Sequence, residues 1–246
     1  MTSTLTHSRH HSSVERRSAK AGGIGALIAT ATFIFGIALL ATTMSDYSTG
    51  DPTPAESVAF EGDHATIFFL WYLVIFLVFG AAIIPLARAL HGRLHSASPL
   101  LADIGAVFAY IWAGLMFATG MISNIGISAV EDLASTNPVQ AEALWSSIDA
   151  VTNGLGGGNE LVGGMWVLLV SLAAWATNAL PRALNALGII SAISGLITVI
   201  PGLEDVGIVF GLGLIIWFAW VGVVLLRSDS STSEQPGNTL TNGAAR

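Results

Sequence analysis

Eight polar residues near the ends of apolar runs carry the side chains that cation binding or proton transfer requires. Oxygen ligands with one histidine can hold a divalent cation, and a carboxylate beside an imidazole can act as an acid and base pair. These residues are Glu61, Asp63, His64, Asn124, Glu131, Asp132, Asn159 and Glu160. A helix N-terminus also favours nearby acids through its dipole, so the alternative interpretation is an acidic surface without a shared site.

Other reactive groups are few. The chain contains no cysteine, which excludes disulfides, thiolate nucleophiles and cysteine-ligated zinc. The three glycines at 156–158 are not followed by Lys-Ser or Lys-Thr, so they form no phosphate-binding loop. His91 and His95 lie near Arg88 and Arg93, in a segment that the pattern predicts to be a solvated loop. We therefore predict no catalytic residue, no metal site and no cofactor.

The composition determines which elements must position these residues. Hydrophobic residues make up 53% of the 246 residues and charged residues only 10%, whereas about a quarter of the residues in a soluble domain are charged. The composition therefore excludes an ordinary soluble domain and indicates a multi-pass membrane protein, with the lipid bilayer as its main partner and no nucleic acid.

Six uncharged apolar runs are long enough to cross a bilayer, which takes roughly 20 residues. They cover residues 21–44, 65–86, 104–130, 161–180, 183–203 and 206–226. The backbone of such a run must satisfy its own hydrogen bonds in lipid, so the predicted fold class is all-α, a bundle of six transmembrane helices. The preceding segment 1–20 and the following segment 228–246 are polar and are predicted to be disordered.

The positions of the basic residues predict the orientation. All nine Lys and Arg residues lie in the two tails or in the loops after the second and fourth runs, and basic residues accumulate on the cytoplasmic side. The three opposite loops hold twelve of the sixteen acids and no basic residue. Both termini are therefore predicted to be cytoplasmic, and the outer face acidic.

Proline, asparagine and glycine predict the helix ends. Pro85 is expected in the last turn of the second helix, where a missing N–H is tolerable. Pro181 and Pro201 mark turns so short that the last three helices must be antiparallel neighbours. Between the Asn137-Pro138 start signal and the Asn153-Gly154 stop signal, apolar residues recur at helical spacing. This pattern predicts a separate amphipathic helix over 138–153, lying on the membrane surface or over the mouth of the bundle.

Small and aromatic residues indicate how the helices pack. Small residues at four-residue spacing, such as Gly22 with Ala26 and Gly207 with Gly211, allow close helix contact within one bundle or in a homodimer. Tryptophans lie mostly within a few turns of the predicted helix ends and suggest interfacial belts. The apolar runs contain hydroxyl and amide groups but no ionisable side chain, which argues against a proton pump or voltage sensor.

Several of these segments resemble the bacterial domain-of-unknown-function 4386 family. They are Gly158-Asn159-Glu160-Leu161 leading into Trp166, Leu180-Pro181-Arg182-Ala183-Leu184 followed by Leu187-Gly188, and Trp217 through Leu226-Arg227. The resemblance covers roughly residues 16–228. It implies a six-helix integral membrane protein with no established activity, so it carries over no catalytic residue.

Three functional hypotheses remain from the sequence. The leading one is a non-catalytic accessory, sensor or stress-related protein of the cytoplasmic membrane, because groups that perform chemistry are missing from the spans. The second is a carrier or channel for a small neutral or cationic solute, which would need a hydrated central cavity. The third is a membrane-embedded enzyme that uses the outer carboxylates, which would need at least three of them in one pocket.

Overall fold

The computed structural model describes residues 2–45 and 52–230, and these ranges consist of helices joined by short turns, without a strand. This confirms the all-α prediction. The elements are α1 (Thr2–Ala41), α3 (Pro54–Asp63), α4 (Ala65–Tyr72), a π-helix (Leu73–Val78), α5 (Phe79–Leu94), α6 (Pro99–Ala134), α7 (Pro138–Thr177), α8 (Arg182–Ile197), a 3-10 turn (Glu204–Val206) and α9 (Gly207–Ser230).

Five of the described helices are long and apolar enough to cross a membrane. They are Ser13–Ala41 of α1, the continuous run Ala65–Leu94, α6, α7 and Gly207–Arg227 of α9. The sixth, α8, is apolar but has only 16 residues; at about 24 Å it is shorter than the hydrocarbon core of about 30 Å. It is shorter than predicted because the chain turns before Pro201 and at Gly202, whose φ is 86°. The architecture is that of a multi-pass membrane bundle.

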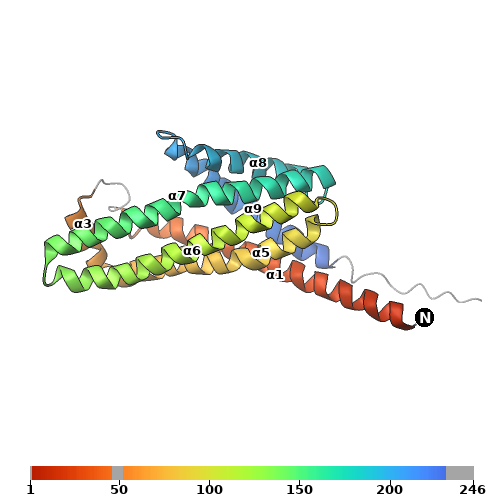
Figure 1. Cartoon of the computed structure of the whole chain (residues 1–246), viewed down its shortest axis with the longest axis horizontal. Helices are drawn as coiled ribbons and strands as arrows, with labels where there is room; N and C mark the ends of the chain where they lie inside the picture. Colours follow the sequence, from red (N-terminus) through yellow and green to blue (C-terminus); the bar gives the residue numbers. More distant parts are fainter. Residues whose placement is uncertain (1, 46–51, 231–246) are drawn as a thin grey trace, which may run out of the picture.

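These five helices and α8 form a closed ring. The α4–α5 run packs on α1 and α6, α6 on α7, α7 on α8, and α8 on α9, while α9 returns to α1 (Figure 1). Helices that are consecutive in the chain are thus neighbours in space, as expected for short connections. The predicted hairpin series of the last three helices is confirmed.

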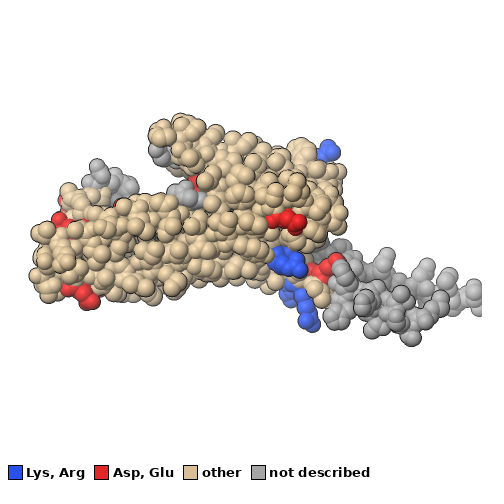
Figure 2. Space-filling model, in the orientation of Figure 1, with Lys and Arg blue, Asp and Glu red and all other residues tan. Residues whose placement is uncertain are grey.

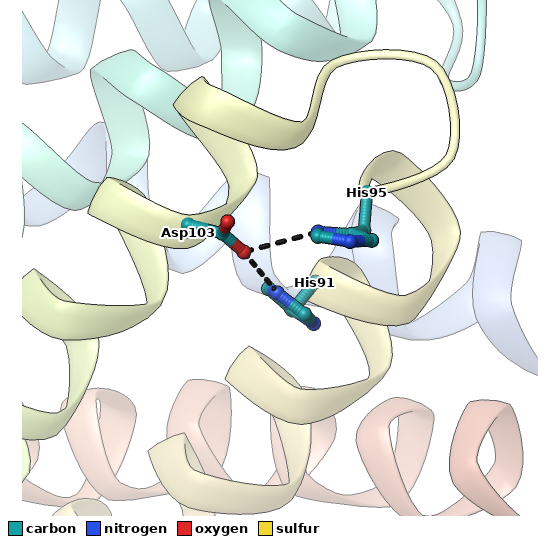
Figure 3. Close-up of side chains that lie close together, drawn as sticks. All are labelled: His91, His95 and Asp103. Atoms are coloured by element: carbon teal, nitrogen blue, oxygen red, sulfur yellow. Dashed lines mark hydrogen bonds and ion pairs between the residues drawn. The ribbon is translucent and has the colours of Figure 1, made fainter.

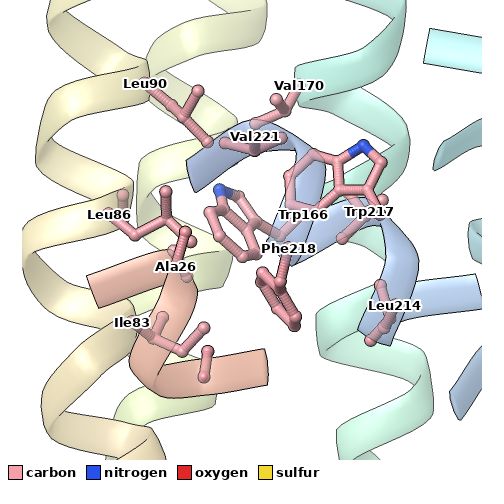
Figure 4. Packing of buried hydrophobic residues seen from close by; sticks show 14 of the residues in the cluster. Ala26, Ile83, Leu86, Leu90, Trp166, Val170, Leu214, Trp217, Phe218 and Val221 are labelled. Carbon is pink, nitrogen blue, oxygen red and sulfur yellow. The ribbon is translucent and has the colours of Figure 1, made fainter. Parts of the chain in front are cut away.

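The centre of this ring is filled by aromatic side chains. Phe218 of α9 lies within 6.4 Å, ring centre to ring centre, of Phe33, Phe79, Trp112, Trp166 and Trp217. These rings come from α1, α5, α6, α7 and α9, and Figure 4 shows Phe218, Trp166 and Trp217 among the surrounding aliphatic residues.

The three core tryptophans correct one expectation. Trp112, Trp166 and Trp217 are completely buried, so they form no interfacial belt. Distance from a predicted helix end does not reveal which side of the helix faces the bundle. These rings are located at the centre because neighbouring helices bring them together.

α7 also differs from the prediction. Asn137 caps it as expected, its side chain accepting a hydrogen bond from the Gln140 N–H. The helix then continues through Asn153 and the three glycines to Thr177, so no separate helix ends near residue 153. Each glycine costs about 1 kcal/mol in a helix, and packing against α6 offsets this cost. The actual stop is Asn178, whose left-handed backbone has φ of 53°.

α5 continues nine residues past Pro85, which is therefore not in its last turn. Leu86, Leu90 and Leu94 follow at four-residue spacing and are all buried, so tertiary packing sustains the helix beyond the proline. His91 consequently lies on the helix, so the predicted solvated loop is wrong for His91. His95 lies at the C-cap, in the exposed turn that follows α5, as predicted.

The segment before the first apolar run is helical as well. α1 begins at Thr2, which contradicts the prediction of a disordered tail over 1–20 for residues 2–20. Extending an existing helix is far cheaper than nucleating one, and this segment adjoins a long apolar helix. Of the predicted C-terminal tail 228–246, residues 228–230 belong to α9, and residues 231–246 lie outside the described residues.

Candidate functional site

The predicted outer cluster begins on α3, a short helix with a complete N-terminal cap. The Thr53 hydroxyl accepts from the Glu56 N–H at 3.3 Å, and the Glu56 carboxylate accepts from the Thr53 N–H at 2.8 Å. The Thr53 N–H and hydroxyl both donate hydrogen bonds to the Glu56 carboxylate and hold the pKa of that carboxyl below its ordinary value. The cap is therefore complete at neutral pH and is lost as the pH falls through that lowered pKa.

Glu61 at the end of α3 is the most buried of the eight predicted residues, with 7% of its surface exposed. Its Oε1 accepts a hydrogen bond from Trp145 Nε1 at 3.0 Å, which joins α3 to α7. Both side chains line a cavity of about 30 Å³, together with Tyr72, Ser123 and Asp149 among others. That volume has room for one or two water molecules and none for an organic substrate.

The structure brings none of the other seven predicted residues to the lining of this cavity. Asp63, Glu131 and Asp132 are exposed. The His64 ring stacks on Phe60 at 4.4 Å, and its Nδ1 hydrogen-bonds the Phe60 carbonyl. These four side chains therefore lie outside the cavity that holds Glu61.

The remaining three predicted residues, Asn124, Asn159 and Glu160, are half-buried. The side-chain oxygens of Asn124 and Asn159 are buried without a hydrogen-bond partner within the described part of the chain. Among the eight predicted residues, only Glu61 is deeply buried, lines the cavity and accepts a hydrogen bond from Trp145 of another helix.

We expect Trp145→Phe to loosen α3 from the bundle, because it removes a donor from a buried carboxylate. Hydrogen bonds to charged groups contribute about 1.5–3 kcal/mol. Hydrogen exchange of the α3 amides in detergent should therefore accelerate by about tenfold or more. Trp175→Phe, at an exposed tryptophan, should leave α3 unchanged; equal exchange in both variants would show that the Glu61 bond does not hold α3.

A second cluster lies at the opposite end of the α4–α5 run. His91 and His95, four residues apart, share a face at the end of α5. Both point at Asp103, in the second turn of α6 (Figure 3). Asp103 Oδ1 lies 2.8 Å from His91 Nε2 and 3.0 Å from His95 Nδ1. A connection of four residues between the two helices brings the three side chains together.

Sequence reasoning missed this cluster. It treated the two histidines as loop residues and assigned no role to Asp103. Histidines at i and i+4, followed by a Ser98-Pro99 helix start and then a carboxylate, are the signal that was present. The signal becomes specific only once α5 is known to extend past Pro85.

At this same end of the molecule, a hydrogen bond connects α5 to the opposite side of the ring of helices. Arg93 Nε donates to the carbonyl of Ala179 at 3.1 Å, which ties the end of α5 to the turn between α7 and α8. Arg93 lies two residues from each histidine of the cluster.

Together these features define an all-α, multi-pass membrane bundle with a polar cluster at each end. In comparisons with known proteins, no family model matches the chain, and no curated protein or solved structure matches it significantly.

Proposed function

We propose that the chain is a non-transporting, non-catalytic accessory or sensor protein of the cytoplasmic membrane. The observation that carries this proposal is the closed ring of helices with its centre occupied by Phe218 and the five rings around it. The resemblance to the domain-of-unknown-function 4386 family remains a prediction.

The carrier alternative has less support. Carriers bind their solute near the middle of the membrane, between helices, where this bundle has packed aromatic rings. The buried polar side chains of the six apolar helices include Thr119, Ser171, Asn185 and Ser191, which are hydroxyl and amide groups. The enzyme alternative requires at least three outer acids in one pocket, and two acids, Glu61 and Asp149, line the cavity at the predicted outer end.

The distribution of charge supports the proposed orientation. Figure 2 shows, on the face drawn, that Lys and Arg gather toward one end of the molecule and that few charged residues lie in its middle. Gly22 lies against Ala89 and Gly23 against Leu226, so the beginning of the apolar part of α1 packs on the last turns of α5 and α9. Lys20, Arg88 and Arg227 lie within two residues of these contacts in the sequence, and positive-inside selection favours placing such an end in the cytoplasm.

Flux measurements test the proposal. Proteoliposomes containing the full chain should release a panel of monovalent cations, sugars and amino acids no faster than protein-free liposomes, with an added ionophore verifying that the vesicles are intact. Saturable flux of any solute above the protein-free rate would overturn the non-transporting assignment.

The orientation has its own prediction. Because the chain lacks cysteine, single replacements at exposed serines give clean probes. A membrane-impermeant maleimide added to intact cells should label Ser147→Cys on α7 and should label Ser96→Cys, between α5 and α6, only after lysis. The reverse labelling pattern would place the termini outside.

A further inference from the structure

We propose that His91, His95 and Asp103 form a binding site for one divalent transition-metal ion, with Zn²⁺ as the best match. The inference goes beyond the proposed function and does not depend on whether the bundle transports a solute. His91 Nε2, His95 Nδ1 and a carboxylate oxygen of Asp103 are the ligand atoms, and all lie within 4.8 Å of one another.

The geometry is close to that of a metal site. With metal–ligand bonds of about 2.0–2.2 Å, ligand atoms around a tetrahedral ion lie about 3.3–3.5 Å apart. Two of the three separations here are 2.8 and 3.0 Å. Small side-chain rotations therefore suffice to admit an ion. Binding would replace the two histidine–Asp103 hydrogen bonds with metal–ligand bonds, and each neutral imidazole would then carry its one proton on the ring nitrogen that does not bind the ion.

The set of donor atoms selects the class of metal. Two imidazole nitrogens and one carboxylate oxygen suit Zn²⁺, Co²⁺, Ni²⁺ and Cu²⁺. Ca²⁺ and Mg²⁺ prefer sites made of oxygen ligands. The Asp103 carboxylate supplies the negative charge that the two neutral imidazoles lack.

Access is open from the aqueous side. The side chains of His91, His95 and Asp103 are 25%, 49% and 56% exposed, respectively. An ion can therefore enter without unfolding of the bundle, and three protein ligands leave a fourth position for water. The site bridges α5 and α6, so a bound ion would cross-link the two helices across their connection.

The test must separate this site from the other histidines. Three of the six histidines, His7, His10 and His11, lie near the N-terminus, and His64 lies at the outer end. The full-length chain is therefore purified without a histidine tag and with His7, His10 and His11 replaced by asparagine. Calorimetric titration with Zn²⁺ should then give about one ion per chain. Titration with Co²⁺ should give the intensified visible absorption of a four-coordinate ion.

Matched variants assign the ligands. His91→Ala and Asp103→Asn should each weaken Zn²⁺ binding by about 100-fold or more, because losing an outer-shell partner already costs 10–100-fold. His64→Ala and Asp132→Asn make the same changes elsewhere, the latter at an exposed carboxylate of the same helix α6, and should leave the affinity unchanged. Gel filtration and helical circular dichroism verify the fold of each variant.

Two results would overturn the site. One is a parent protein that takes up no Zn²⁺ at millimolar concentration. The other is a Zn²⁺ affinity that is the same in Asp103→Asn or His91→Ala as in the parent, since a three-ligand site cannot lose a ligand without cost. Neither result would bear on the flux experiment, so the two proposals fail independently.

Discussion

Replacing Phe218 by alanine is expected to lower the free energy of unfolding by about 3–5 kcal/mol, the range for removing a buried aromatic ring. Phe218 is fully buried, and its ring contacts aromatic rings from α1, α5, α6, α7 and α9. Since lipid is as apolar as the ring, the loss arises from packing contacts and not from transfer to water. One truncation therefore weakens five helices together.

The measurement is unfolding of the protein in mixed micelles, with denaturing detergent as the titrant. Phe69→Ala makes the same chemical change at a residue that is 49% exposed on α4, so it should cost less than 1 kcal/mol. If the two variants unfold at the same detergent fraction, the aromatic centre does not hold the ring of helices together. If liposomes with Phe218→Ala released solute and liposomes with the parent protein did not, the Phe218 side chain would also block a path through the bundle.

Gly25→Leu is expected to separate α1 from α5 and to destabilise the bundle by about 3 kcal/mol or more, the upper part of the range for overpacking. A Cβ atom on Gly25 would lie 2.5 Å from the Ala82 carbonyl oxygen and 3.2 Å from Pro85 Cγ. Backbone atoms of a packed helix cannot move aside as a flexible side chain can. Since α1 also packs on α9, its displacement would open the ring.

Gly211→Leu is the matched control, because no atom lies within 4 Å of a Cβ placed on that glycine of α9. Gel filtration and the same unfolding titration compare the two. Gly25→Leu should give a low yield of monodisperse protein, and Gly211→Leu a normal one. Equal yields and equal stability would show that α1 does not approach α5 as closely as described.

The small residues at four-residue spacing were predicted to serve either packing within one bundle or a homodimer, and the close approach at Gly25 is of the first kind. Ala26, Ala109, Ala113 and Ala192 are buried within the bundle, so contacts between helices of one chain account for these positions. Gly211 has open space beside it. A homodimer stays a prediction.

The lengths of the apolar runs predicted the helices well, because a helix that crosses a bilayer needs a long uncharged run whichever helices pack against it. Five of the six runs lie in helices long enough to cross, and Asn137 begins α7 as predicted. Local signals failed where neighbouring helices decide the outcome. Pro85 does not end α5, because the leucines beyond it are buried, and Asn153-Gly154 does not end α7, because this helix packs on α6.

The sites were harder to predict than the helices, for a related reason. The eight predicted residues carry similar polar groups near helix ends, but of these eight only Glu61 contacts Trp145 and lines the cavity. Asp103 meets His91 and His95 only because α5 runs to Leu94 and α6 starts at Pro99. A two-residue error in either helix end would rotate one partner away, and prediction of helix ends rarely reaches that accuracy.

The uninterrupted α7 has a mechanical consequence. Its 40 residues form a rod about 60 Å long, twice the hydrocarbon thickness, and Trp166 is clamped in the aromatic centre. With Trp166 as a fulcrum, the tip at Pro138 lies about 42 Å away and the opposite end at Thr177 about 16 Å away. A tilt of about 10° would sweep the tip by about 7 Å and the short arm by about 3 Å. The short arm ends beside Ala179, whose carbonyl accepts the Arg93 hydrogen bond. A displacement of the tip at Pro138 would therefore reach the histidine end of α5 at a reduced amplitude.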